Sequence, residues 1–121
     1  MKKYKKILKD KSIYDWQAKI CSALASPVRL RIIDIVGGGE KNSGELLEYL
    51  KIPKANLSQH LSVLKNAGLI NTRKEGLFHY VSLAVPKVKD ACALVRSVLL
   101  EKIAADEKKN AELIKELRAV R

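Results

Sequence analysis

Apolar residues recur at helical spacing through the first half of this sequence, and turn-forming residues separate the apolar segments. Residues 15–25 are predicted to form a first helix. A second helix begins at the Ser-Pro pair 26–27, because serine caps a helix and proline suits its first position. Glycines 37–39 end this second helix. The Asn-Ser pair 42–43 and the leucines after it predict a third helix.

A fourth helix follows a short break at Pro53. Leu57, Leu61 and Leu64 recur at i, i+4 and i+7, which is the pattern of one buried helix face. The Ala-Gly pair 67–68 is expected to end this helix.

The hydrophobic period then changes to that of strands. Residues 69–73 and 77–83 are rich in β-branched and aromatic side chains, and the Lys-Glu-Gly segment 74–76 between them predicts a hairpin turn. A long last helix is expected from Pro86 onward, with a break around Asp106.

This order of elements predicts a mainly α fold with a small β-hairpin wing, a winged helix-turn-helix. In such a fold the third helix and the turn support the fourth helix, which is free to enter a major groove about 12 Å wide. We expect a basic N-terminal arm over residues 1–14, the winged helix domain over 15–104 and a helical extension over 105–121.

Length and composition limit the class of protein. A chain of 121 residues fits one domain, and its 47% hydrophobic residues suffice for a core. No apolar run approaches the roughly 20 residues of a membrane span, and charged residues interrupt the N-terminus too early for a signal peptide. Two cysteines suit a reducing compartment, so we expect a cytoplasmic protein without membrane partners.

The net charge of +11 is unevenly distributed. Residues 1–11 contain six lysines and one acid, whereas residues 49–74 contain no carboxylate at all. Because phosphate repels carboxylates, a basic window without acids is typical of a nucleic-acid surface, although it is also compatible with a chance gap in a basic protein. The cations in this window are Lys51, Lys54, Lys65, Arg73 and Lys74.

The fourth helix and the wing supply the candidate DNA-binding residues. Short polar side chains between the leucines can bond base edges or phosphate, and two residues near the helix N-terminus favour a phosphate. His60 is either a donor to DNA or a half-buried structural histidine, and the two wing cations suit phosphate or the minor groove. The candidates are Lys54, Asn56, Ser58, Gln59, His60, Ser62, Lys65, Arg73 and Lys74.

Two segments resemble the ArsR/SmtB family of bacterial winged-helix repressors. Residues 23–33 are similar to its N-terminal signature, and residues 57–70 are similar to its recognition-helix signature almost residue for residue. The wing strand ending at residues 80–83 also resembles the family, so the similarity extends over roughly residues 15–100. The resemblance implies a homodimer, joined through the first and last helices, that represses a promoter until an inducer releases it.

The metal sites usual in that family are absent or incomplete in this sequence. Residues 44–49 contain no thiol where the arsenic-sensing type has a Cys-x-Cys pair. Asp90 and Cys92 resemble the start of the zinc-sensing type, but Ile103 and Asp106 stand at the later positions and isoleucine cannot bind a metal. We therefore expect no metal and no cofactor.

Cys21 and Cys92 leave an alternative open. They fall on the first and last helices of the predicted domain. The two thiols are either small buried hydrophobic residues or a switch for oxidants, reactive sulfur or a soft metal.

We interpret the sequence as a homodimeric, sequence-specific DNA-binding transcriptional regulator, a repressor that reads a palindromic operator. The alternatives are a thiol-based sensing repressor that uses Cys21 and Cys92, and a winged-helix module that binds protein or RNA. An enzyme is not expected, because no nucleophile–base pair or phosphate loop can be assembled, and glycines 37–39 lack the lysine of a phosphate loop.

Overall fold

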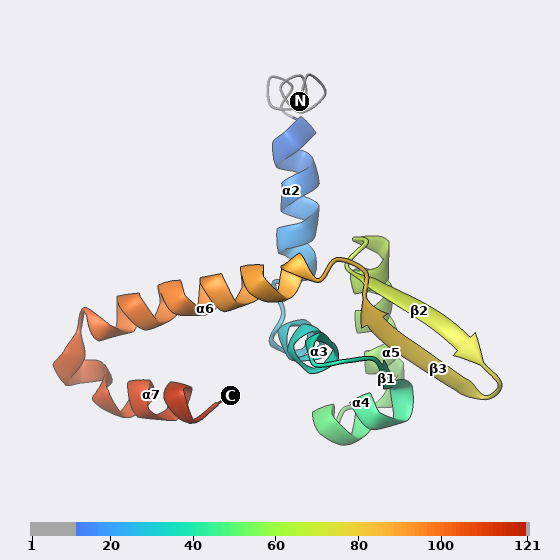
Figure 1. Ribbon diagram of the computed structural model, residues 1–121. Coiled ribbons are helices and arrows are strands. Elements are labelled where there is room, and N and C mark those ends of the chain that lie inside the picture. The colour runs from blue at the N-terminus through green and yellow to red at the C-terminus, as the bar shows by residue number, and fades with distance from the viewer. Residues whose placement is uncertain (1–11, 121) are drawn as a thin grey trace. The chain divides into compact units, whose positions relative to one another are not determined.

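The computed structural model describes residues 12–120, except for the side chains of residues 107–110. The chain divides into two compact units, one ending at Val88 and one beginning at Lys89, and each is described by itself (Figure 1). Most of the predicted basic arm lies outside the described residues. The elements are α2 (Ser12–Ala23), α3 (Pro27–Gly37), β1 (Lys41–Asn42), α4 (Ser43–Leu50), α5 (Lys54–Asn66), β2 (Ile70–Glu75), β3 (Phe78–Leu83), α6 (Lys87–Ala104) and α7 (Glu107–Ala119).

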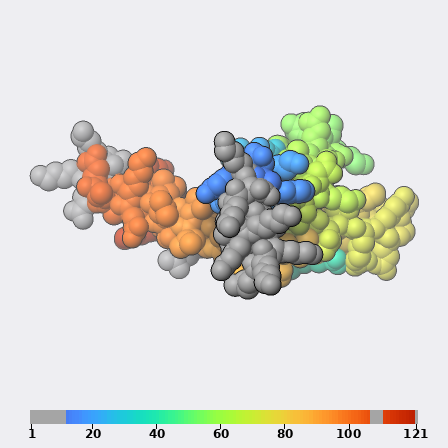
Figure 2. All heavy atoms as spheres, turned by 90° about the horizontal axis from the view of Figure 1, so that it is seen from above, coloured from blue at the N-terminus to red at the C-terminus, as the bar shows by residue number. Residues whose placement is uncertain are grey.

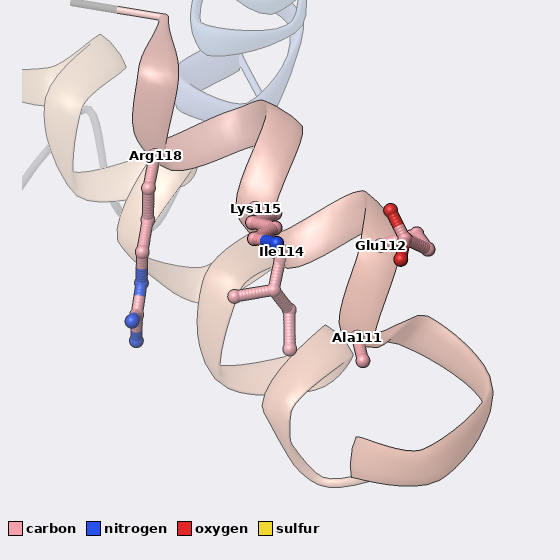
Figure 3. A pocket seen from close by; sticks show the side chains of 5 residues that line it. All are labelled: Ala111, Glu112, Ile114, Lys115 and Arg118. Atoms are coloured by element: carbon pink, nitrogen blue, oxygen red, sulfur yellow. The ribbon is translucent and has the colours of Figure 1, made fainter.

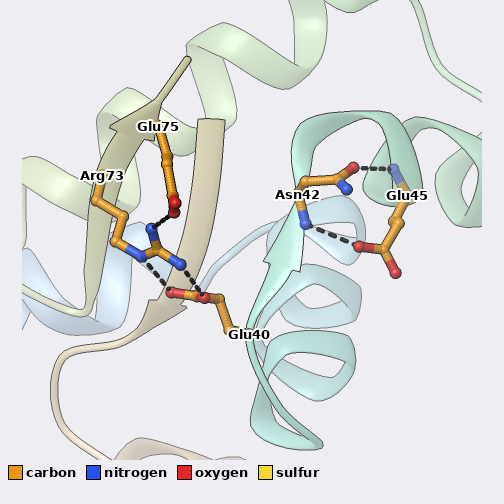
Figure 4. Close-up of polar contacts among 5 residues, drawn as sticks. All are labelled: Glu40, Asn42, Glu45, Arg73 and Glu75. Carbon is orange, nitrogen blue, oxygen red and sulfur yellow. Dashed lines mark hydrogen bonds and ion pairs between the residues drawn. The ribbon is translucent and has the colours of Figure 1, made fainter. Parts of the chain in front are cut away.

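The predicted helix caps of the first unit are confirmed. Ser26 caps α3, where its Oγ accepts a hydrogen bond from the Arg29 backbone N–H at 3.3 Å. Asn42 and Glu45 form a reciprocal capping box at the start of α4, with distances of 2.9 and 3.1 Å (Figure 4). Such caps satisfy donors that a helix start otherwise leaves unpaired.

The wing is an antiparallel hairpin of β2 and β3, in which Ile70 pairs with Leu83 and Glu75 pairs with Phe78. The turn is therefore only Gly76 and Leu77, and Gly76 has the φ of +61° that a tight hairpin turn requires. The sequence placed the turn at 74–76, so β2 ends two residues later than expected and β3 begins one residue later. The longer pairing keeps Lys74 and Glu75 in the ladder.

A third strand, β1, was not predicted. It contains two residues that pair with Val81 and Tyr80 of β3, which gives the strand order β1-β3-β2. Two residues are too few to produce a hydrophobic period. The short strand fixes the start of α4 to the base of the wing, and the Ser43 hydroxyl adds a hydrogen bond of 3.3 Å to the His79 carbonyl.

One apolar core joins the helices and the sheet of the first unit. Leu57 and Leu64 hold α5 against this core, while the wing projects beside α5 (Figure 2). The mainly α winged helix-turn-helix fold is thereby confirmed. The most deeply buried side chains are Ile32, Ile33, Leu46, Leu64 and Val81.

The second unit contains most of α6 and all of α7. The expected break lies at Ala105 and Asp106, between the two helices. One face of α6 exposes large apolar side chains, which are Leu94, Val95, Val98 and Leu99. Over the part of the chain that is described, no helix is both long and apolar enough to span a membrane.

Candidate nucleic-acid interface

The outer side of α5 carries the predicted reading residues. Leu57 and Leu64 are buried in the core, whereas Leu61, which was expected on the same buried face, is half-buried. Among the candidates on this helix His60 alone is half-buried. The others are exposed, so their polar groups are available to a ligand. The exposed candidates are Lys54, Asn56, Ser58, Gln59, Ser62 and Lys65.

These exposed residues form two stripes, because side chains three or four positions apart share a helix face. One stripe carries cations and hydroxyls, a combination that suits phosphate, and consists of Lys54, Ser58, Ser62 and Lys65. The neighbouring stripe carries the amides Asn56 and Gln59, which suit the edge of adenine. Each exposed face of α5 thus has its own chemistry.

Val63 lies on the amide stripe, four positions after Gln59, and was not among the predicted site residues. Its side chain is 39% exposed. A small apolar group among amides can contact the methyl group of thymine. The sequence contained a signal for it, since Val63 is an apolar residue that falls outside the leucine stripe.

The N-terminal end of α5 favours an anion. Pro53 stands at the N-cap without a side-chain cap, and the first turn contains no acid. The positive end of the helix and Lys54 therefore face no carboxylate from this turn.

His60 is half-buried and contacts Arg29 on α3. Its Nδ1 lies 3.1 Å from Nη1 of Arg29. Arg29 also donates from Nε to the Ala23 carbonyl at 2.6 Å and from Nη2 to the Ser22 carbonyl at 3.4 Å. Sequence reasoning left His60 open and gave Arg29 no role, although Arg29 is one of two arginines near the start of a mostly apolar helix.

Arg73 is held by two carboxylates (Figure 4). Its Nε and Nη2 donate to both oxygens of Glu40 at 3.1 and 2.8 Å, and its Nη1 donates to Glu75. The guanidinium also lies 4.3 Å from the centre of the Tyr80 ring. Three of its five N–H groups are thus engaged within the wing and the segment before β1.

These contacts shift the pKa values of Glu40 and Arg73 so that both groups stay charged. The hydrogen bond from Arg73 holds the pKa of Glu40 below its usual value of 4.5, and the charge of Arg73 acts in the same direction. The hydrogen bonds that Arg73 donates to Glu40 and Glu75 raise the pKa of Arg73 further above its already high value. Arg73 therefore stays charged, and a DNA phosphate would compete with carboxylates for it.

The other wing candidate, Lys74, is exposed on β2 opposite His79 of β3. It is unlike Arg73 in that no ion pair is found for its ammonium group among the described residues. At the tip of the wing, Leu77 is 94% exposed. The wing thus presents a lysine, an exposed apolar tip, and a charged arginine that is paired with two carboxylates.

The two cysteines lie in different units. Cys21 is exposed in the last turn of α2, and Cys92 is half-buried on α6. A shared role for the two thiols remains a hypothesis.

A hollow of about 490 Å³ lies along α7 (Figure 3). Its described lining contains one acid and two cations but no nucleophile–base pair, and consists of Ala111, Glu112, Ile114, Lys115 and Arg118. Within the described part of the chain, no group of three His, Cys, Asp or Glu residues could hold a metal ion.

The comparison with known proteins agrees with this geometry. Residues 26–72, which span α3 to the start of the wing, match the family model described as bacterial regulatory protein, arsR family. The chain is 33% identical over 72 residues to the transcriptional repressor SdpR of Bacillus subtilis, a match that covers 60% of this chain and 80% of SdpR. The HTH-type transcriptional regulator Rv0081 of Mycobacterium tuberculosis is 32% identical over 93 residues, which is 76% of this chain and 82% of Rv0081. The chain belongs to the arsR family of bacterial regulatory proteins.

Solved structures of arsR-family and related regulators show the same fold. The crystal structure of Rv0081 has a TM-score of 0.72 at 31% identity, covering 80% of this chain and 98% of that one. The solution structure of the homodimeric winged helix-turn-helix DNA-binding domain of Mb0332 from Mycobacterium bovis has a TM-score of 0.65 at 31% identity, covering 80% of this chain and 84% of that one. The arsR family consists of DNA-binding transcriptional regulators, which are not enzymes.

Proposed function

We propose that this arsR-family protein is a homodimeric transcriptional repressor in which α5 of each copy reads one half of a palindromic operator. The observation that carries the proposal is the outer side of α5, where exposed cations, hydroxyls and amides stand without a carboxylate. Phosphate contacts from the cationic stripe would position the helix, and the amides would read bases. Chromosomal DNA lies in the bacterial cytoplasm, so the protein would act there.

Exposed apolar side chains support the homodimer. Trp16 and Ile20 on α2 are exposed within the first unit, and α6 exposes four large apolar residues within the second. Surfaces of this kind are typical of protein–protein contacts. The Mb0332 domain is homodimeric, and SdpR is a repressor, which favours the same assembly and the same sign of regulation here.

Release by an inducer is part of the proposal, and Cys21 favours one form of it. An exposed thiol is accessible to oxidants and to reactive sulfur, unlike a buried cysteine. If Cys21 and Cys92 form the switch, the double variant Cys21→Ser/Cys92→Ser binds DNA but is not released by oxidant. A double variant that is still released would eliminate the thiol switch.

Selection of duplexes from a random pool tests the proposed function. We expect the wild-type protein to enrich an inverted repeat and to bind the selected duplex about 10³-fold or more tightly than a scrambled duplex. Equal affinity for both duplexes, or preferential binding of RNA or of a protein partner, would instead support the alternative of a winged-helix binding module.

A further inference from the structure

The guanidinium of Arg29 connects three helices of the first unit. Arg29 belongs to α3, its Nε and Nη2 bind the carbonyls of Ala23 and Ser22 in the last turn of α2, and its Nη1 binds His60 on α5. The carbonyls at a helix end lack partners within the helix, so a cation there is stabilised both by hydrogen bonds and by the helix dipole. Arg29 thus closes the end of α2 and reaches the centre of α5 at the same time.

The contact with Arg29 also decides which nitrogen of His60 carries the proton. A guanidinium has only donors and keeps its charge, so the nitrogen that faces it must accept. Nδ1 of His60 is therefore unprotonated, and in the neutral ring the proton lies on Nε2. The two hypotheses for His60 consequently become compatible, because the structural contact at Nδ1 leaves an N–H donor at Nε2.

This contact gives α5 an orientation that apolar packing does not. Burial of Leu57 and Leu64 favours the helix against the core, but apolar contacts have no preferred direction. A charge-assisted hydrogen bond has both a preferred length and a preferred angle. His60 directly follows Gln59, so the position of its ring is tied to that of the amide stripe.

We propose that Arg29 is a positioning residue that couples the end of α2 to the orientation of α5 through His60. This inference rests on the proposed role of α5 in reading DNA. A change at α2, such as the binding of a second copy or of an inducer, would move the Ser22 and Ala23 carbonyls. The guanidinium would follow them, and the hydrogen bond to His60 would lengthen. α5 would then lose the orientation in which it reads the DNA sequence, although none of its own residues had changed.

The first test is the tautomer of His60 in the wild-type protein. Nitrogen-15 NMR of imidazole-labelled protein distinguishes protonated from unprotonated ring nitrogens, and His79→Gln assigns the signals because the chain has only two histidines. We expect the neutral ring of His60 to carry its proton on Nε2. A proton on Nδ1 would overturn the proposal, whatever the protein binds.

The second test separates positioning from charge. Arg29→Gln is compared with Arg31→Gln, which removes the same charge from the same helix and breaks a hydrogen bond of 3.0 Å to the Tyr49 carbonyl of α4, away from α5. We expect Arg29→Gln to weaken binding of the duplex selected by the wild type about tenfold, with little change for a scrambled duplex. We expect Arg31→Gln to change both affinities alike. The tautomer preference of His60 should weaken only in Arg29→Gln.

Circular dichroism establishes that each variant is folded. If Arg29→Gln is unfolded, Arg29→Lys takes its place, because lysine keeps the charge but lacks the planar fork that serves several acceptors. Equal ratios of selected to scrambled affinity in the Arg29 and Arg31 variants would overturn the proposal. If the wild type itself did not distinguish the two duplexes, the proposed function would fail. The tautomer of His60 would still show whether Arg29 donates a hydrogen bond to Nδ1.

Discussion

Gln59 and Lys65 represent the two kinds of contact that single residues on α5 can make. Gln59 lies on the amide stripe and Lys65 on the cationic stripe, and both side chains are exposed. An amide can recognise a base edge, whereas a lysine is a point charge that serves phosphate at any sequence. The two residues therefore give different experimental signatures.

We expect Gln59→Ala to weaken binding of the selected duplex by about 1–3 kcal/mol and to leave the scrambled duplex almost unaffected. Lys65→Ala should weaken binding of both duplexes about equally and reduce the slope of log K against log salt by about 1. Fluorescence anisotropy over a range of salt concentrations measures both effects. If the two variants lost affinity for the two duplexes in the same proportion, the amide stripe and the cationic stripe would not differ in the kind of DNA contact that they make.

The ion pair between Glu40 and Arg73 predicts a defined pH dependence. Because the folded pKa of Glu40 lies below its usual 4.5, ionised Glu40 stabilises the folded state above that value, and this contribution is lost as the pH falls through the lowered pKa. Carbon-13 NMR of the side-chain carboxyl should therefore show Glu40 titrating below 4.5. In Arg73→Gln we expect its titration to return toward the usual value.

Arg118→Gln on α7 is the matched control, since it removes one positive charge and keeps the Arg73 side chain that binds Glu40. A normal titration of Glu40 in the wild-type protein would contradict the bidentate pair. The titration of Glu40 can also be compared with and without DNA. If Arg73, an expected DNA contact, leaves its carboxylates to bind phosphate, the pKa of Glu40 should return toward its usual value when DNA is added.

Within elements, the position of α5 depends on leucines that are fully removed from solvent. Leu64 is 0% exposed, and its neighbour Val63 lies on the outer side of the same turn. We expect Leu64→Ala to lower the free energy of unfolding by about 2–5 kcal/mol, because it leaves a cavity. Val63→Ala should cost less than about 1 kcal/mol.

Urea denaturation without DNA measures the stability of both variants. Similar losses of stability at the two positions would mean that α5 does not bury the face assigned to it. The comparison is matched, because the two side chains are adjacent in sequence and both lose only apolar atoms.

Much of the fold could be predicted because its signals are local. The leucine period of α5, the serine cap of α3 and the glycines that end α3 each act within a few residues, so the sequence displays them directly. The break in the last helix near Asp106 was also predicted from the sequence. The pairing of β1 with β3 was not, because a two-residue strand has no period of its own.

For the candidate interface, the exposed side of α5 could be predicted from the sequence, but the contacts among its residues could not. The period of α5 indicates which of its residues are exposed, and the structure agrees except that Leu61, expected on the buried face, is only half-buried. His60, which the sequence left open, is half-buried as well. Glu40 lies 33 residues from its partner Arg73, and Arg29 lies 31 residues from its partner His60, and no local pattern connects residues at that separation. The absence of acids from 49–74 also concealed the two acids that hold Arg73, since Glu75 directly follows that window and Glu40 precedes it by nine residues.

For the whole molecule, the exposed apolar face of α6 predicts self-association. Val98→Glu would place a charge within this face, and burying an unpaired charge is costly. We expect this variant to shift the protein from dimer to monomer in analytical ultracentrifugation and to weaken binding of the selected duplex, while the winged helix unit stays folded.

Ser97→Glu provides the control for the dimer. It introduces the same charge one residue earlier, outside the apolar face of α6. A dimer that survives Val98→Glu but not Ser97→Glu would place the interface elsewhere.

A hydroxyl-radical footprint of the wild-type protein on the selected duplex, combined with the stoichiometry of the complex, tests most directly whether paired copies of α5 read the operator. We expect two chains per duplex and two symmetric protected patches whose centres are about one helical turn, 10–10.5 base pairs, apart or a whole multiple of it. One chain per duplex, or a single continuous protected patch without symmetry, would contradict a dimer that reads two half-sites.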